Sequence, residues 1–114
     1  MNSCLFCRIV EGAIPADIVF QDDHALAFRD INPQAPVHIL IIPKRHVPSL
    51  HDSAHEDRDL LARLLFLCKD IAQRQGLAES GYRVVTNVGR DAGQTVFHMH
   101  LHVLGGRHLS WPPG

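Results

Sequence analysis

Residues 96–104 read Val-Phe-His-Met-His-Leu-His-Val-Leu, an apolar stretch with a histidine at every second position. Because side chains in a β-strand alternate between its two faces, a strand here places His98, His100 and His102 on one face. The other face is predicted to enter the core, and it carries Phe97, Met99, Leu101 and Val103. The stretch therefore predicts a strand with a buried apolar face and a histidine face that borders a cleft or solvent.

Three ordinary explanations compete with a functional site for this row of histidines. They are a core histidine with satisfied hydrogen bonds, a solvated strand face, and a chance metal-binding tract. Three imidazoles in register favour a site, because neutral imidazole is costly to bury unpaired and titrates near neutral pH. The spacing alone does not distinguish catalysis from metal binding.

Length and composition bound the class of protein. A chain of 114 residues fits a single domain, residues 1–114, and a formal net charge of -1 with scattered basic residues argues against a nucleic-acid partner. We find no apolar stretch of the roughly 20 residues that a membrane span needs, and no signal-peptide pattern. Three cysteines, an odd number, fit a reducing compartment. We therefore expect a soluble, cytoplasmic protein without a membrane partner.

One long helix of about twenty residues is predicted before Gly76, which is a typical C-terminal stop. Ser53 and Glu56 have the spacing of a capping box at its start. Apolar residues then recur at helical spacing and predict one stripe that packs on a sheet. The stripe comprises Leu60, Leu61, Leu64, Leu65, Cys68, Ile71 and Ala72.

Five strands are predicted, at residues 18–21, 25–29, 37–42, 82–87 and 96–104. The turns between them are short enough for antiparallel pairing, so the fold class is α+β, with a helix that covers one face of the sheet. Within residues 37–42, His38, Leu40 and Ile42 share a face. His38 is thus a fourth imidazole that can face the other three.

The residues around the three histidines resemble the histidine triad (HIT) superfamily. The run Gly-Gln-Thr-Val-Phe-His-Met-His-Leu-His-Val-Leu-Gly-Gly-Arg at 93–107 is similar to its motif, and the Gly-Gly-Arg is similar to the Hint branch, the histidine triad nucleotide-binding proteins. Further segments resemble Hint proteins in the same order: Ile-Pro-Ala at 14–16, Phe-Arg-Asp-Ile-Asn-Pro-Gln-Ala-Pro at 28–36, Ile-Pro-Lys at 42–44, Gly-Tyr-Arg at 81–83 and Trp-Pro-Pro-Gly at 111–114. The resemblance implies a HIT-like fold: a five-stranded antiparallel sheet, one long helix, a shorter N-terminal helix, and a sheet extended across a homodimer.

The resemblance also implies a catalytic sequence. His100 is expected to attack the α-phosphorus of a nucleotide and form a nucleotidyl-histidine, which water then hydrolyses. His102 is expected to contact the phosphate or leaving group, His38 to fix the tautomer of His100, and Asn87 and Thr95 to bond phosphate oxygens or the leaving atom. Imidazole suits this role because most of it is neutral at pH 7, and a nucleophile divides one displacement into two steps. No cofactor is expected to take part in catalysis.

Nucleotide binding is likewise assigned by resemblance. Asp30 is expected to accept hydrogen bonds from both ribose hydroxyls, the backbone N–H groups of 93–95 to bond phosphate, and apolar residues to hold the purine, although each of these apolar residues also suits a core. Trp111 lies in a tail that either is disordered or, as in Hint proteins, crosses a dimer interface to approach the partner's site. The complete predicted set is Asp30, Ile31, Phe28, Phe6, Ile9, Ile14, Leu40, Asn87, Gly93, Gln94, Thr95, Val96, His100, His102 and Trp111.

Cys4 and Cys7 form a C-x-x-C pair, which alone is half of a tetrahedral zinc site. Some bacterial relatives bind zinc through a similar pair, a histidine after the Pro-Lys segment and the first triad histidine. The matching positions are Cys4, Cys7, His46 and His98, so the resemblance implies a structural zinc that removes His98 from proton transfer. Cys68 is predicted to be a core residue.

The expected activity is hydrolysis of the P–N bond of purine nucleoside 5′-phosphoramidates, conjugates of AMP or GMP, and of aminoacyl adenylates. One alternative is a dinucleoside polyphosphate hydrolase, but that branch typically follows its triad with proline and basic residues instead of Gly105-Gly106. A galactose-1-phosphate uridylyltransferase would carry glutamine in place of His102. Another alternative is a nucleotide- or zinc-binding regulatory protein without enzymatic function. The physiological leaving group and the choice between adenosine and guanosine stay open.

Overall fold

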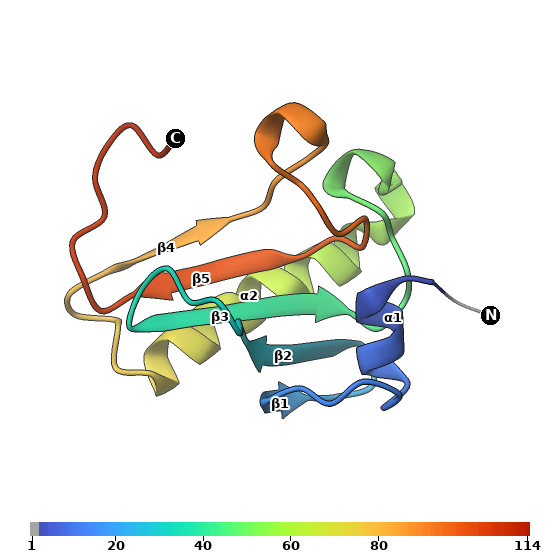
Figure 1. The fold of residues 1–114 in the computed structure, drawn as a ribbon, viewed down its shortest axis with the longest axis horizontal. Coiled ribbons are helices and arrows are strands. Elements are labelled where there is room, and N and C mark those ends of the chain that lie inside the picture. Colours follow the sequence, from blue (N-terminus) through green and yellow to red (C-terminus); the bar gives the residue numbers. More distant parts are fainter. Residues whose placement is uncertain (1–2) are drawn as a thin grey trace.

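A five-stranded antiparallel sheet carries one helix on each face in the computed structural model, which describes residues 3–114 (Figure 1). The strand order is β1-β2-β3-β5-β4. The elements are α1 (Leu5–Val10), β1 (Ile18–Gln21), β2 (Ala25–Arg29), β3 (Val37–Pro43), α2 (Arg58–Arg74), β4 (Tyr82–Val85) and β5 (Leu101–Gly105), with short 3-10 turns at Leu50–Asp52, His55–Asp57 and Arg90–Ala92. The predicted α+β fold is confirmed. No helix in the described range 3–114 is long and apolar enough to cross a membrane.

The two faces of the sheet carry two different cores. On β3, Ile39 and Ile41 belong to the larger core together with α2, which lies behind the sheet in Figure 1. Leu40 and Ile42 belong to a smaller core on the opposite face, where α1 contributes Phe6. The predicted common face of His38, Leu40 and Ile42 is therefore the α1 face.

The strand that contains the histidines is shorter than predicted, because β5 begins at Leu101 and not at residue 96. The backbone N–H of Met99 donates to the carbonyl of Val47, so the chain has left its pairing with β3 by that point. Phe97 lies outside the strand and is 55% exposed, so its prediction as a core residue is wrong. The rest of the predicted core face is confirmed: Met99, Leu101 and Val103 are buried.

Strand β4 also ends earlier than predicted, at Val85 instead of residue 87. The hydroxyl of Thr86, the next residue, donates to the carbonyl of His100 at 2.9 Å. This bond ties the segment after β4 to the segment that precedes β5.

The start of the long helix differs from its prediction. The predicted capping box of Ser53 and Glu56 is wrong. The Ser53 hydroxyl donates to the carbonyl of Leu50. The carboxylate of Asp57, and not that of Glu56, accepts a backbone N–H, which is that of Ala54. Within the predicted stripe, Leu65 is 56% exposed because α2 turns its other side to the sheet, so that assignment is wrong. Cys68 is buried as predicted, and burial raises the pKa of its thiol to about 12.

Candidate functional site

A cavity of about 300 Å³ lies on the α1 face of the sheet, over the middle of β3 and the start of β5. Its walls come from α1, from β2 with the turn that follows, from β3, and from residues 95–102. Most of the predicted nucleotide-binding residues line it: Phe6, Ile9, Ile14, Phe28, Asp30, Ile31, Leu40, Thr95, Val96, His100 and His102. Four of these, Phe6, Ile9, Phe28 and Leu40, are also members of the smaller core, so the cavity wall and the core are one surface.

His100 is held in one tautomer. Its Nδ1 lies 2.8 Å from the backbone carbonyl of His98, and since a carbonyl only accepts, Nδ1 carries the proton and donates. A neutral ring then has an unprotonated Nε2. The ring is also fixed by Phe6, which packs edge-on at a centroid distance of 5.1 Å. The tautomer of the neutral ring thus leaves the lone pair of Nε2 free beside the cavity.

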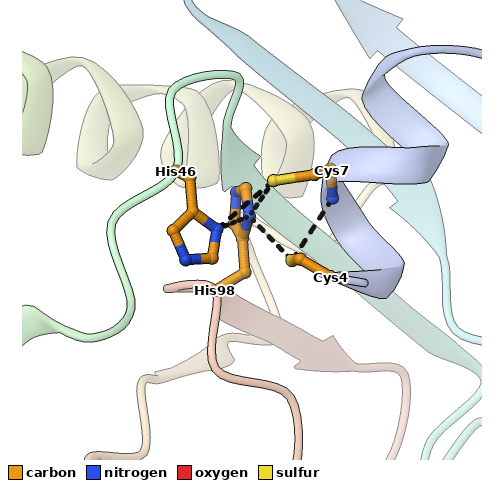
Figure 2. A group of neighbouring side chains, drawn as sticks. All are labelled: Cys4, Cys7, His46 and His98. Atoms are coloured by element: carbon orange, nitrogen blue, oxygen red, sulfur yellow. Dashed lines mark hydrogen bonds between the residues drawn. The ribbon is translucent and has the colours of Figure 1, made fainter. Parts of the chain in front are cut away.

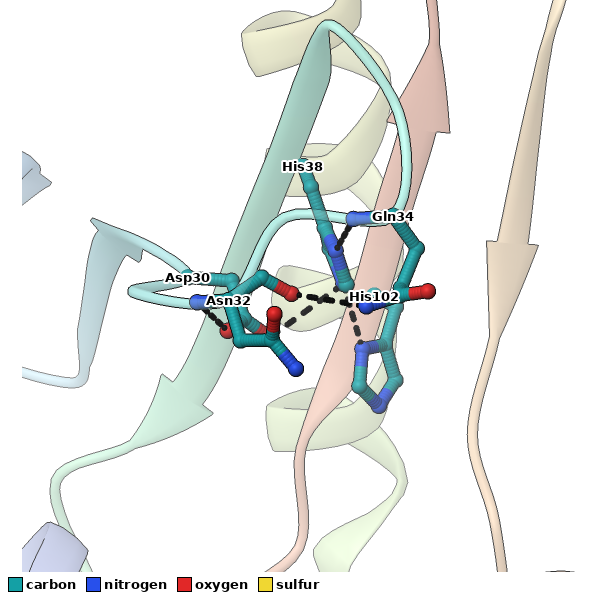
Figure 3. A network of polar contacts seen from close by, with 5 residues as sticks. All are labelled: Asp30, Asn32, Gln34, His38 and His102. Atoms are coloured by element: carbon teal, nitrogen blue, oxygen red, sulfur yellow. Dashed lines mark hydrogen bonds and ion pairs between the residues drawn. The ribbon is translucent and has the colours of Figure 1, made fainter.

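A second pair of imidazoles forms an ordered hydrogen-bond chain (Figure 3). The backbone N–H of Gln34 donates to Nδ1 of His38 at 3.0 Å, so the proton of a neutral His38 is on Nε2. His38 Nε2 lies 2.9 Å from Nδ1 of His102 and donates to it. The proton of His102 is therefore on its Nε2. Asp30 also approaches His38 Nε2, with Oδ2 at 3.4 Å.

Burial keeps both rings of this pair neutral. It lowers the pKa of His38 below the usual value for histidine, an effect that the carboxylate of Asp30 partly offsets. Burial, together with the nearby His100 and His38 rings, lowers the pKa of His102 to about 4. At pH 7 the network is therefore a set of neutral imidazoles whose tautomers are set by their neighbours.

The remaining predicted nucleotide-binding residues lie outside the cavity wall described above. Gln94 is buried, and its side chain is occupied by backbone: Oε1 accepts from the N–H of Gly89, and Nε2 donates to the carbonyls of Pro48 and Val96. Gly93 is exposed, Asn87 is half-buried, and Trp111 is 81% exposed. The side chain of Gln94 therefore holds the loop at 89–96 together and links it to Pro48.

The four predicted metal ligands converge on one point beside this cavity (Figure 2). Cys4 and Cys7 come from the start of α1, His46 from the segment after β3, and His98 from the segment before β5. Nδ1 of His98 lies 3.4 Å from Sγ of Cys4, 3.5 Å from Sγ of Cys7 and 3.2 Å from Nδ1 of His46. Sγ of Cys7 lies 3.3 Å from Nδ1 of His46.

The chemistry of this donor set fits a metal. Nε2 of His98 lies 2.8 Å from the carbonyl of Pro43 and must donate to it, so Nδ1 of a neutral His98 is a lone pair directed at the cluster. Bonds of about 2.0–2.1 Å to nitrogen and about 2.3 Å to sulfur place the ligand atoms of a tetrahedral zinc site roughly 3.3–3.8 Å apart. The observed separations are close to those values. The cluster of Cys4, Cys7, His46 and His98 is thus a candidate metal site.

Comparison with known proteins identifies the family. Residues 11–109 match the family model described as HIT domain. The chain belongs to the HIT family. An "Uncharacterized HIT-like protein" of Synechococcus elongatus is 54% identical over 110 residues, which cover 96% of both chains.

Two solved HIT structures are similar throughout. A HIT family hydrolase from Legionella pneumophila Philadelphia 1 is 55% identical, with a TM-score of 0.97 and coverage of 98% of this chain and 100% of that chain. A histidine triad nucleotide-binding protein from Candida albicans is 35% identical, with a TM-score of 0.83 and coverage of 96% and 83%. The whole described fold is therefore that of HIT proteins.

Several residues of this HIT site had not been predicted. Leu5, Pro15 and Ala16 line the cavity because α1 and the segment after it cover its side, and Arg29 lines it from the end of β2. Three backbone or hydroxyl groups orient the histidines: the N–H of Gln34, the carbonyl of Pro43 and the hydroxyl of Thr86. Backbone partners leave no mark in side-chain spacing, so no sequence pattern indicated them.

Proposed function

We propose that the protein is a nucleoside phosphoramidase of the Hint type. It hydrolyses the P–N bond of purine nucleoside 5′-phosphoramidates, and aminoacyl adenylates as a related substrate class. The observation that carries this proposal is the hydrogen bond from His100 Nδ1 to the His98 carbonyl, which leaves Nε2 free as a nucleophile beside a cavity that contains Asp30. The resemblance to a HIT family hydrolase and to a nucleotide-binding HIT protein supports it.

In the first step, Nε2 of His100 attacks the α-phosphorus. An N–P bond to His100 forms and the P–N bond to the amine breaks, and the leaving nitrogen takes up a proton from solvent, so that it departs as a neutral amine. The carbonyl of His98 stabilises the positive charge that develops on the His100 ring. His102 presents an Nε2–H, which donates to a phosphate oxygen or to the leaving amine. Thr95 lines the cavity and is the second donor for this role.

In the second step, water attacks the phosphorus of the nucleotidyl-histidine. An O–P bond forms, a proton of the attacking water passes to solvent, the N–P bond breaks, and His100 regains its lone pair as the nucleoside monophosphate is released. Asp30 holds the ribose diol, and the apolar wall with Phe6 and Phe28 holds the purine. Because that wall is apolar, it accepts adenine or guanine.

A hydrolase of dinucleoside polyphosphates is the second enzymatic candidate, since the same nucleophile would attack the same phosphorus. A regulatory protein that only binds nucleotide or zinc is the third. The ordered tautomers favour an enzyme over the regulator, because a binding site does not need a free Nε2 on His100.

The test is steady-state hydrolysis of an adenosine 5′-phosphoramidate beside a diadenosine polyphosphate. Wild type, His100→Ala and the exposed control His55→Ala are compared without added metal. We expect preference for the phosphoramidate, a loss of several orders of magnitude in His100→Ala, and no change in the control. Retention of more than about a tenth of turnover by His100→Ala would refute the mechanism. Preference for the polyphosphate would support the second candidate, and AMP binding without turnover would support the regulator.

We further propose that the cysteine–histidine cluster holds a structural zinc. Zinc bound there would hold the start of α1 to the segments that carry His46 and His98, with four protein ligands and no open position. We expect about one zinc per chain in purified wild type and in Cys68→Ala, and little in Cys4→Ser. Clearly substoichiometric zinc in wild type after zinc supplementation would refute the site.

We also propose that the chain forms one HIT domain that assembles as a homodimer through α2 and β4. β4 is an edge strand with a free side, and its Tyr82 and Val84 are exposed. On α2, Leu65 and Phe66 are exposed as well, with Phe66 at 64%. Covering these apolar side chains favours association. A monomer at micromolar concentration in a light-scattering measurement would contradict the dimer.

A further inference from the structure

His98 belongs to two sites at once. Its imidazole contributes Nδ1 to the cysteine–histidine cluster, and its backbone carbonyl accepts the hydrogen bond from Nδ1 of His100. Its Nε2 donates to Pro43, so both ring nitrogens and the carbonyl of this buried residue are engaged. The N–H of the same peptide unit, that of Met99, donates to the carbonyl of Val47, the residue after His46. The cluster residues His46 and His98 are thus directly connected to the peptide unit whose carbonyl selects the tautomer of His100.

A second connection runs through α1. Phe6 lies between the two cysteines in the sequence and packs edge-on against both His98, at a centroid distance of 6.0 Å, and His100, at 5.1 Å. It also contacts Phe28 in the cavity wall. The position of the His100 ring thus depends on where α1 is held.

Helix α1 is held by tertiary contacts of two kinds: Phe6 and Ile9 pack in the smaller core, and Cys4 and Cys7 join the cluster with His46 and His98. It has only six residues, and a helix of that length is not stable on its own. The backbone hydrogen bonds recorded for residues 4–14 outside the helix interior, such as those from Glu11 and Ala13, also stay within that segment. Cys4 and Cys7 are the polar side chains that connect this segment to His46 and His98.

We propose that the cluster of Cys4, Cys7, His46 and His98 is a positioning device for the nucleophile: a metal held there locks the His98 carbonyl and Phe6 against His100. This inference rests on the proposed nucleophile and metal site, and adds that the two sites are coupled. His98 acts through His100 and is a positioning residue. Without the metal, the His98 carbonyl and Phe6 are held less firmly, and the His100 tautomer with the proton on Nε2, which leaves that nitrogen no lone pair for attack, becomes populated.

The coupling is tested on wild-type protein as purified, after metal removal with a chelator, and after zinc is restored. Nitrogen-15 NMR of the imidazole rings at one fixed pH reads the tautomer of His100, and circular dichroism reads the fold. A single-turnover experiment measures the rate of nucleotidyl-enzyme formation, and equilibrium binding measures the affinity for AMP. Cys4→Ser is the ligand variant, and His55→Ala is the matched control outside both sites.

Metal removal is expected to leave the fold intact, to convert His100 from a single Nδ1–H tautomer to a mixture, and to slow nucleotidyl transfer by about 100-fold. The affinity for AMP should change by less than about tenfold, because Asp30 and Phe28 are positioned by β2 and its following turn and Phe6 is only one part of the apolar wall. Zinc should restore the tautomer and the rate in wild type but not in Cys4→Ser. The His55→Ala protein should behave as wild type.

Four other outcomes are decisive. An unchanged tautomer and rate in folded, metal-free protein would overturn the coupling and leave the proposed activity in place. Unfolding on metal removal would overturn it too, because the cluster would then be a folding site. A protein as purified that already lacks metal but has an ordered His100 would overturn it as well. A tautomer that changes with metal in a protein that hydrolyses no substrate would support the coupling and refute the proposed function.

Discussion

His38 donates from Nε2 to Nδ1 of His102 across 2.9 Å, between the neighbouring strands β3 and β5. In the register of these strands His38 lies opposite Leu104, so His102 is its diagonal neighbour on the same face. The backbone N–H of Gln34 sets the tautomer of His38, and His38 in turn sets that of His102. A turn between β2 and β3 thus determines which nitrogen of His102 offers a proton to the cavity.

Replacing His38 should therefore impair catalysis more than binding. In His38→Ala, Nδ1 of His102 loses its donor and the ring is free to reverse its tautomer, so we expect kcat to fall by up to about 100-fold with a small change in KM. His38→Gln keeps an N–H donor and should recover part of the rate. The exposed His24→Ala is the matched control and should retain full activity. Equal losses of kcat in His38→Ala and His24→Ala would contradict the proposal that His38 sets the tautomer of His102.

Stability should decrease on acidification because of the same network. The pKa of His102 is about 4 in the folded protein against 6.5 for an unperturbed histidine, so the unfolded chain binds the extra proton first. The free energy of unfolding should be highest above pH 6.5 and fall as the pH is lowered towards 4. His38, whose pKa is also lowered, adds to the same trend. Urea unfolding at pH 7 and pH 5 measures the difference, which should be on the order of 1–2 kcal/mol after allowance for partial exposure.

The control for this pH dependence is His102→Gln, which cannot titrate. Its unfolding midpoint should change less between pH 7 and pH 5 than that of wild type, although the variant is less stable at both. A wild-type stability that rises on acidification would show that the folded protein raises the pKa of these histidines.

Strand alternation predicted which side chains share a face of the sheet, but not the residues at which each strand begins and ends. The common face of His38, Leu40 and Ile42 followed from alternation alone, because β3 is regular over its whole length. The start of β5 could not be predicted in this way, because the N–H of Met99 donates to the carbonyl of Val47, which is distant in sequence. Such a tertiary bond has no local pattern, and Phe97 was misplaced for that reason.

Local sequence pattern could not assign the apolar cavity wall or the cysteine–histidine cluster, for a different reason. Phe6 and Phe28 serve as core and as cavity wall, so hydrophobic spacing cannot tell one from the other. Cys4 and Cys7 are close in sequence, but only the folded sheet brings His46 and His98 to them. The family resemblance supplied these positions, and the structure supplies the hydrogen bonds that explain them.

Gln94 should matter for stability more than for direct nucleotide contact. Its buried amide makes three hydrogen bonds to backbone, with Gly89, Pro48 and Val96. In Gln94→Ala these groups lose their partner, and we expect a loss of about 2–4 kcal/mol in the free energy of unfolding by urea denaturation. Gln73→Ala, at an exposed position of α2, should change it by less than about 0.5 kcal/mol. A stable Gln94→Ala protein that fails to bind AMP would instead indicate direct contact.

Gly106 should tolerate no side chain, for two separable reasons. Its φ of +91° is costly for any other residue, by about 1–2 kcal/mol, and a Cβ added there would lie 2.9 Å from Cβ of the rigid Pro36 ring. Gly12 has a similar φ of +78° but open space around it, so Gly12→Ala measures the backbone effect alone. We expect urea unfolding to report a loss of about 1–2 kcal/mol for Gly12→Ala and about 2–4 kcal/mol for Gly106→Ala. Equal losses would show that Pro36 moves aside.

The clash between a side chain at position 106 and Pro36 should also affect catalysis, because Arg107 donates from Nε to the carbonyl of Gln34, whose N–H orients His38. Gly106→Ala, and not Gly12→Ala, should therefore lower kcat in the folded protein.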